Sequence, residues 1–230
     1  MEKDRVFTDE ELKEIGAKTL DLVFEAIEAG DKEKAKKLSK RMYDESIGLS
    51  DVYRYWVTGL MSYIYRTYGI DSLDQAYREA FKMNSEKMEE ASKKADLRGK
   101  VKQTARALRA LGQALSIRED DEKICLTMQP CGSGQKLLEQ GAYGPPCNFA
   151  MIEESHPITF GRGKGDFPVY CAHAAVLEIL AMERSGYPNT VAYPAEPMAS
   201  ASCTYCIYKD PKDIPEEVYK RAGKEKPESF

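Results

Sequence analysis

The stretch "SIREDDEKICLTMQPCGSGQ", residues 116–135, separates two halves of different character. Upstream of it, apolar residues recur at helical spacing and the chain contains neither Cys nor His. Within it, the acidic run is typical of a turn or linker, and "KICLTMQP" (123–130) alternates as a strand does. The stretch therefore predicts a boundary between a helical bundle region, residues 1–118, and a second region, residues 119–230.

The upstream region is predicted to form a bundle of helices. Thr8 followed by Glu11 is a capping-box pattern, and apolar residues then recur at helical spacing up to Gly30. Further helical segments are expected at 31–46, 50–69 and 72–115. The last of these is either one very long helix or two helices that meet near Gly99. The apolar, tyrosine-rich stripe of 50–69 predicts either packing inside the bundle or the interface of a homodimer.

The downstream region is predicted to mix short strands and helices. A glycine turn after residue 131 enters a short helix, and a longer helix is expected within 169–188. The alternating segments 190–197 and 202–210 predict a hairpin, and 214–223 a short terminal helix. This order predicts an α+β fold: an N-terminal helical bundle followed by a small Cys-rich α+β domain with a mainly antiparallel sheet.

The composition limits the class of protein. Hydrophobic residues make up 42% of the chain and charged residues 31%, which is typical of a soluble globular protein. No apolar run approaches the roughly 20 residues that cross a bilayer, and the charged N-terminus has no export signal. The net charge of −4 argues against a nucleic-acid partner. We therefore expect a cytoplasmic protein with a small-molecule substrate or ligand, and neither a nucleic-acid nor a membrane partner.

The six cysteines are the main functional signal. Without an export signal, disulfides are not expected, so we interpret the cysteines as thiols in a reducing cytoplasm. All six cysteines and both histidines lie downstream of residue 124. Buried free cysteine is common in protein cores, which is the alternative explanation. Their concentration beside both histidines nevertheless favours a metal site.

Such a site would draw its ligands from separate segments. Cys203 and Cys206 have the spacing of a zinc knuckle. Strand residues alternate between faces, however, so Cys206 either completes the site or packs in the core. Cys171 precedes a helix, and His173 shares its site only if Cys171 lies at or before the first turn. Cys131 stands at a glycine turn that can aim a thiolate inward. From Cys131, Cys171, His173, Cys203 and Cys206 we expect a zinc site, with an iron–sulfur cluster as the alternative.

Other residues of the downstream region are candidate catalytic and substrate-binding groups. His156 is the best available general acid or base, because histidine titrates near neutral pH, and it is a further candidate for the fourth metal ligand. Glu154 is an alternative, although a solvated loop charge is the commoner role. Arg162 and Lys164 stand beside glycines and could bind a substrate carboxylate, as could the helix N-terminus at Ser133. Phosphate-loop, dinucleotide-binding, Ser-His-Asp and HExxH patterns are absent from the sequence.

Two segments carry a resemblance to a known family: "YCAHAAVLEILAMERSGYPNTV" (170–191) and "CTYCIYKD" (203–210). They resemble the L-2-amino-thiazoline-4-carboxylic acid hydrolase-like proteins and, more distantly, the cysteine-bearing 4-vinyl-reductase-type ligand domains. In that family one cysteine precedes a helix and another opens a last strand of the form Cys-x-aromatic. Cys171 and Cys203 would occupy these positions, with Cys131 at a third. The resemblance covers about the last hundred residues, and where it implies an acidic residue shortly after the helix cysteine this chain has His173.

These observations predict a zinc-dependent, thiolate-ligated hydrolase or lyase. Its substrate would be a small carboxylated compound, of which sulfur-containing or heterocyclic acids are examples. Thiolate-bound zinc can polarise a carbonyl or lower the pKa of bound water, so that hydroxide attacks at neutral pH. Two alternatives stay open. One is a small-ligand binding or sensory module that zinc only staples, with its pocket among the tyrosines of the helical half. The other is an iron–sulfur protein.

Overall fold

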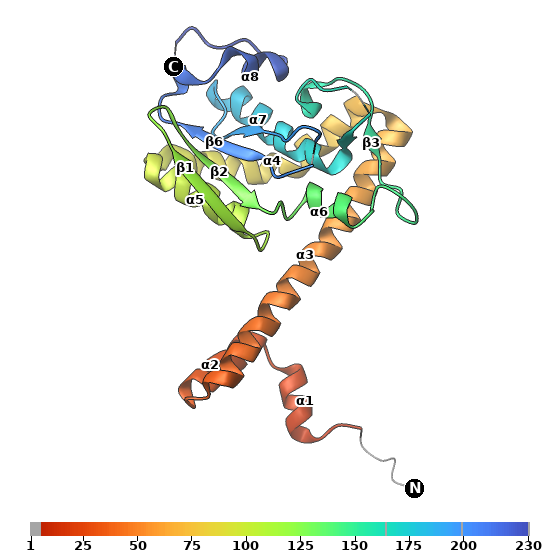
Figure 1. Cartoon of the computed structure of the whole chain (residues 1–230), viewed down its shortest axis with the longest axis vertical. Coiled ribbons are helices and arrows are strands. Elements are labelled where there is room, and N and C mark those ends of the chain that lie inside the picture. The colour runs from red at the N-terminus through yellow and green to blue at the C-terminus, as the bar shows by residue number, and fades with distance from the viewer. Residues whose placement is uncertain (1–5, 164, 199, 230) are drawn as a thin grey trace. The chain divides into compact units, whose positions relative to one another are not determined.

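The computed structural model has the predicted α+β fold, with a helical N-terminal region ahead of a mainly antiparallel sheet (Figure 1). It describes residues 6–163, 165–198 and 200–229, with the backbone alone at four positions of one helix. The chain divides into two units, Met1–Tyr53 and Arg54–Phe230. The boundary expected between residues 118 and 119 thus lies inside the second unit.

The first unit consists of α1 (Asp9–Gly16), α2 (Thr19–Glu28) and the beginning of α3 (Lys32–Tyr68). The predicted capping box is confirmed, since Thr8 Oγ1 accepts a hydrogen bond from the Glu11 backbone and Glu11 Oε2 accepts one from the Thr8 backbone. One helix was expected up to Gly30, but extended backbone at Ala17 and Lys18 divides it into α1 and α2. The small core of this unit contains Leu22, Val23, Ala26 and Leu38.

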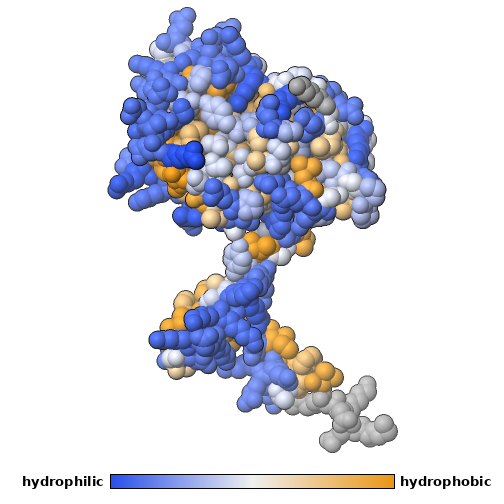
Figure 2. All heavy atoms as spheres, in the orientation of Figure 1, coloured by the Kyte–Doolittle hydropathy of each residue, from blue (hydrophilic) through white to orange (hydrophobic). Residues whose placement is uncertain are grey.

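Much of the apolar surface of the first unit remains exposed, as the orange atoms in Figure 2 show. Leu12 and Ile15 on α1, and Leu20, Phe24 and Ile27 on α2, are between 46% and 60% exposed. Burial of apolar area is the main source of folding free energy. Because this unit buries little apolar area, it gains little stability from this source.

The second unit begins with the rest of α3, followed by α4 (Ile70–Lys94) and α5 (Leu97–Arg109). Of the two alternatives for residues 72–115, the structure has two helices. They are separated at Ala95 and Asp96, and the Asp96 side chain accepts a hydrogen bond from Gly99 N at 2.7 Å to start α5. The helix ends before Gly112, whose φ of 82° turns the chain into the first strand.

The main sheet has the order β1–β2–β6–β5 and is antiparallel throughout. Its strands are β1 (Ala114–Glu119), β2 (Lys123–Gln129), β5 (Val191–Tyr193) and β6 (Thr204–Tyr208). The acidic run is the β1–β2 turn, because Asp120 Oδ1 accepts hydrogen bonds from the backbone of Glu122 and Lys123. One face packs Leu126 and Ile207 against α5, and the other contributes Cys206 to the main core.

The remaining elements surround this sheet. They are α6 (Gly134–Glu139), α7 (Ala172–Ser185), α8 (Glu216–Arg221), the 3-10 turns Pro157–Thr159, Val169–Cys171 and Pro211–Asp213, and a two-stranded sheet of β3 (Met151–Ile152) and β4 (Phe167–Pro168). Glu178 of α7 accepts a hydrogen bond from Ala192 N at 2.9 Å. Arg221 of α8 donates to Ala192 O at 2.7 Å and to Glu178 Oε1 at 2.8 Å. This buried ion pair joins both helices to β5.

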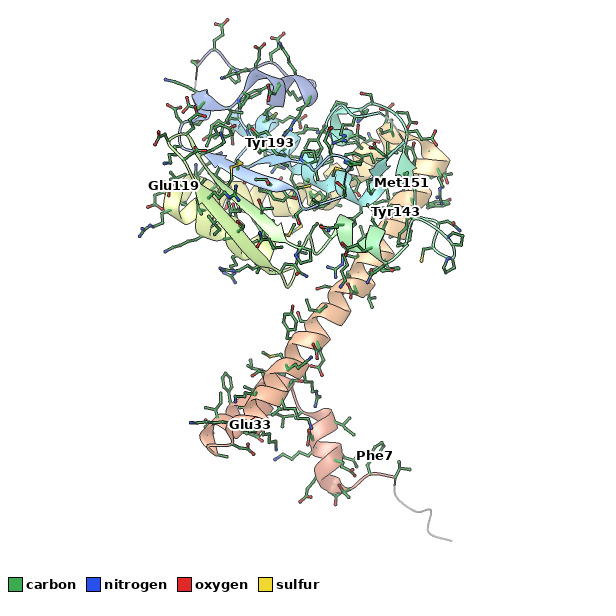
Figure 3. All side chains as sticks on the ribbon, in the orientation of Figure 1. Phe7, Glu33, Glu119, Tyr143, Met151 and Tyr193 are labelled. Atoms are coloured by element: carbon green, nitrogen blue, oxygen red, sulfur yellow. A yellow bond between two sulfur atoms is a disulfide. The ribbon has the colours of Figure 1, made fainter. Side chains whose placement is uncertain are left out.

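Cys125 and Cys206 form a disulfide between β2 and β6 (Figure 3). The register of the two strands places these residues directly opposite each other, with their Cα atoms 4.0 Å apart. The expectation that all six cysteines are free thiols is therefore wrong for this pair. Cys206 is also corrected as a metal ligand, because its sulfur is bonded to Cys125.

Within the described residues, none of the helices combines the length and the apolar character that crossing a bilayer requires.

Candidate functional site

Three buried thiols from distant parts of the sequence come together at one end of the sheet. Cys131 follows the end of β2 and Cys203 precedes the start of β6. Because these strands are antiparallel neighbours, both cysteines lie at the same end of the strand pair. Cys171 joins them at the beginning of α7. Their exposed fractions are 7%, 7% and 6%, respectively. The structure thus brings together the three cysteines that the sequence analysis placed in one site.

The thiols influence one another's protonation. Burial raises the pKa of Cys171, and the neighbouring Cys203 and Cys131 raise it further. Burial, together with Cys131, raises the pKa of Cys203 to about 11, while the Arg162 guanidinium acts in the opposite direction. All three are sulfur donors of the kind zinc prefers, and binding a metal would require them to lose their protons. Among the described residues, no three Cys, His, Asp or Glu side chains are arranged to hold a metal ion.

Ser133 lies directly beside this cluster. Its Oγ is 3.1 Å from Cys131 Sγ, and the side chain is 4% exposed. The turn that holds both residues needs a glycine between them, because a Cβ on Gly132 would lie 2.9 Å from the backbone oxygen of Leu111. The hydroxyl of Ser133 does not cap α6. The predicted position of Ser133 at a helix N-terminus is therefore correct, and its hydroxyl contacts a thiol.

His173 is held in one tautomer. Its Nδ1 lies 2.6 Å from Tyr170 O, and because a carbonyl oxygen only accepts, Nδ1 carries the proton and Nε2 the lone pair. The rings of these two residues also pack edge to face, with centroids 5.0 Å apart. Burial lowers the pKa of His173, more than the hydrogen bond to Tyr170 raises it. At neutral pH the imidazole is therefore uncharged, and Nε2 can accept a proton or bind a metal.

A cavity of about 500 Å³ lies between α4, α5, α7 and the sheet. Its walls are mainly apolar, and we call the part lined by Ser133, His173 and Tyr205 its inner end. Burial raises the pKa of Tyr205, and Cys203, Cys131 and Cys171 raise it further, so this phenol lies among the thiols. The cavity therefore ends at the cysteine cluster.

The structure does not bring His156 and Glu154 to this cavity. His156 starts the 3-10 turn at Pro157: its Nδ1 accepts a hydrogen bond from Ile158 N, and its Nε2 lies 3.5 Å from Asp71. Glu154 accepts a short hydrogen bond from the Tyr65 hydroxyl, which lowers the pKa of the carboxyl. Neither is among the side chains of the described chain that line the cavity. The catalytic roles expected for them stay predictions, which the lining of this cavity does not support, since both side chains have their partners elsewhere.

Arg162 and Lys164 are the two basic residues expected to bind a substrate carboxylate. Arg162 donates to Ala195 O at 3.3 Å and pairs with Glu196 at 3.1 Å, so its guanidinium is already neutralised, although it lies close enough to Cys203 to affect its pKa. Lys164 lies outside the described residues. Of the aromatic residues of α3, Trp56 and Tyr63 are exposed and do not line this cavity.

Sequence reasoning missed two features of this region. The first is Tyr205, which the sequence showed only as the aromatic residue of the Cys-x-aromatic pattern. Tyr205 and Ile207 alternate on β6, so both lie on the face of the sheet that α5 covers. On that face Tyr205 lines the cavity. The cross-strand disulfide was also missed. Its signal was present, because Cys125 and Cys206 each lie inside an alternating run, and two such runs can pair.

Tyr143 is a further buried group near the cluster (Figure 3). It packs edge to face on Phe149, and burial raises the pKa of its phenol, with Cys171 adding to the effect. Its hydroxyl has no hydrogen-bond partner among the described residues. The surroundings of Cys171 are therefore rich in phenols as well as thiols.

Comparison with known proteins adds no assignment to this geometry. No family model, no curated protein and no solved structure matches the chain. The function of the chain must therefore be inferred from its thiols, its imidazole and its cavity.

Proposed function

We propose that the protein is a hydrolase or lyase that acts on a small carboxylated compound at the inner end of the cavity. One observation carries this proposal: three buried free thiols, Cys131, Cys171 and Cys203, adjoin a cavity lined by His173 and Ser133. Perturbed titratable groups beside a mainly apolar cavity are typical of active sites. The resemblance to thiazoline-carboxylate hydrolase-like proteins, which includes Cys171 and Cys203, supports the same class.

In this proposal Cys131, Cys171 and Cys203 would hold one zinc ion as thiolates beside the cavity, once their side chains turn toward one another from the arrangement described above. When bound, zinc would supply Lewis acidity to a carbonyl or an activated water. The residues of this chain then have separate tasks. His173 accepts a proton at Nε2, because Tyr170 keeps Nδ1 protonated. The hydroxyls of Ser133 and Tyr205 donate hydrogen bonds to the substrate group that reacts at this end of the cavity.

A second candidate is a ligand-binding module, which the size of the cavity favours. At about 500 Å³, it can enclose a small organic molecule without any chemistry taking place. In that case His173 would be the fourth ligand of a closed, structural zinc site. The coordination number of the metal separates the two candidates.

The deciding experiment is elemental analysis of anaerobically purified protein, with a visible spectrum of the same sample. We expect about one zinc per chain and no colour. Cys131→Ser, Cys171→Ser and Cys203→Ser should each lose the metal, while Cys147→Ser, a change at an exposed free cysteine, should retain it. Iron with sulfide would instead establish the iron–sulfur alternative. Metal-free protein that is indifferent to the three substitutions would overturn the metal proposal.

The proposal includes a location in the cytoplasm. A reducing cytoplasm fits the four free cysteines, whereas the Cys125–Cys206 disulfide is the form expected outside it. Rapid acid quenching of cells, followed by alkylation and mass analysis, measures the state of this pair in place.

The homodimer is also proposed. Trp56, Leu60 and Tyr63 lie on one face of α3 and are 60%, 49% and 58% exposed. Such an aromatic-rich face is typical of protein interfaces. Sedimentation velocity tests this directly: a dimer that dissociates in Leu60→Glu would support it, and a monomer across the concentration range would exclude it.

A further inference from the structure

Three cationic side chains line the cavity: Lys87 from α4, Lys100 from α5 and Arg184 from α7. Arg184 lies eleven residues along α7 from His173, and Lys100 lies eleven residues before Leu111, which packs against Gly132 beside Cys131. We therefore place these cations at the end of the cavity away from the thiols. Arg184 has a carboxylate 3.8 Å away, on Glu86. Lys87 and Lys100 have no ion-pair partner among the described residues. Two lysine charges are therefore available to an anion at this end.

The two ends of the cavity are separated along α7. His173 and Arg184 both line it, and the residues between them that do so follow one face of the helix. Eleven residues of α-helix span about 16 Å, at 1.5 Å per residue. A ligand that reaches from the lysines to the thiols must therefore be elongated, and a compact single-ring compound would leave one end unoccupied.

The walls between these ends are apolar. Leu108 of α5, Leu111 just after it, Met128 of β2 and Leu177 of α7 contribute apolar side chains to the lining. Glu178, which also lines the cavity, does not repel an anion, because Arg221 pairs with its carboxylate at 2.8 Å. The cavity thus offers a cationic end, an apolar middle and an inner end of hydroxyl, imidazole and thiol groups.

From this complementarity we propose that the ligand is an elongated monocarboxylate with an apolar body of medium-chain length. Its carboxylate lies between Lys87 and Lys100, and its apolar body follows α7. The end of the ligand opposite the carboxylate lies at the inner end of the cavity, beside Ser133 and His173. This inference narrows the substrate class of the proposed function. It rests on that function only for the chemistry at the inner end of the cavity, beside the thiols. Binding itself requires no metal.

The test is isothermal titration of the full-length protein with decanoate, and with 1-decanol and decylamine as probes of equal chain length. We expect decanoate to bind in the micromolar range, decylamine not to bind, and added salt to weaken the decanoate complex. The double substitution Lys87→Gln/Lys100→Gln should weaken decanoate binding by about tenfold or more and leave 1-decanol unchanged. Lys102→Gln, a matched change on α5 at a residue that does not line the cavity, should have no effect.

A second variant tests the apolar middle. Leu177→Trp should block the cavity and abolish decanoate binding, while its circular dichroism reports whether the fold is retained. Decanoate that fails to bind the unmodified protein, or that binds Lys87→Gln/Lys100→Gln equally well, overturns the inference. If decanoate binds as expected but the protein carries no metal, the ligand class stands and the zinc chemistry fails. If zinc is present but decanoate does not bind, the zinc proposal stands and the ligand class proposed here fails.

Discussion

His173 links the site to the pH dependence of stability. Burial lowers its pKa in the folded protein, whereas histidine in an unfolded chain titrates near pH 6.5. Below that pH the unfolded state binds the proton first, so the free energy of unfolding should fall as the pH drops from about 6.5 through the folded pKa. Above about pH 6.5 this effect vanishes.

We expect His173→Gln to remove this contribution. Urea unfolding between about pH 5 and pH 7 measures it, and His156→Gln is the matched control because it is the only other histidine. A slope that survives unchanged in His173→Gln would show that the imidazole is not the group responsible.

Single cysteines should differ widely in reactivity. With its pKa raised to about 11, Cys203 has roughly one thiolate per thousand molecules at pH 8, and burial shields it further. Cys147 is exposed and should react with iodoacetamide first. In denaturant without reductant, the four cysteines outside the disulfide should all react. Mass analysis counts the adducts, and six adducts before reduction would contradict the Cys125–Cys206 bond.

At the scale of elements, the disulfide joins β2 to β6. These are the two strands whose neighbouring ends place Cys131 and Cys203 close together. The bond closes a long loop, and such bonds contribute about 2–4 kcal/mol to stability. Reductant should lower the free energy of unfolding by that amount in the unmodified protein. The double variant Cys125→Ala/Cys206→Ala should be insensitive to reductant, whereas Cys147→Ala should respond as the unmodified protein does. Equal midpoints with and without reductant would argue against a stabilising bond.

The elements themselves were largely predictable, because helical and alternating patterns are local properties of the sequence. The α+β class, the hairpin of β5 and β6 and the capping box of α1 followed from such patterns. The continuity of α3 did not. Two helices were expected where one runs from Lys32 to Tyr68, since a mid-helix glycine such as Gly48 costs only about 1 kcal/mol and long helical flanks can carry it.

The candidate site was predictable only in part. The convergence of Cys131, Cys171 and Cys203 followed from one cysteine per segment, but the cavity beside them did not. Its walls come from three helices and a sheet face, and no periodicity within one segment shows which faces will meet across such a space. For the same reason the sequence could not show that His156 and Glu154 lie outside the lining of this cavity, where Ile158 N and the Tyr65 hydroxyl donate hydrogen bonds to them.

For the molecule as a whole, the two units should differ in local stability. The core of the first unit has four buried apolar residues, whereas the second contains the main core. Regions with few buried contacts open more readily. Hydrogen–deuterium exchange of the full chain should therefore show rapid exchange in α1 and α2 and strong protection in α7. Comparable protection in both would mean that the exposed apolar side chains of the first unit are covered in solution, by a second copy or another partner.

The ion pair of Glu178 and Arg221 also determines where this sheet can grow. A β-strand at the margin of a sheet presents unpaired backbone groups that can recruit a strand from another molecule. On β5 the outward N–H and C=O of Ala192 are already bonded to these two side chains, so strand addition is blocked there. At the opposite margin, β1 pairs with β2 and with no other strand of the described residues. Any intermolecular extension of the sheet, in assembly or in aggregation, would therefore begin at Ala114–Glu119.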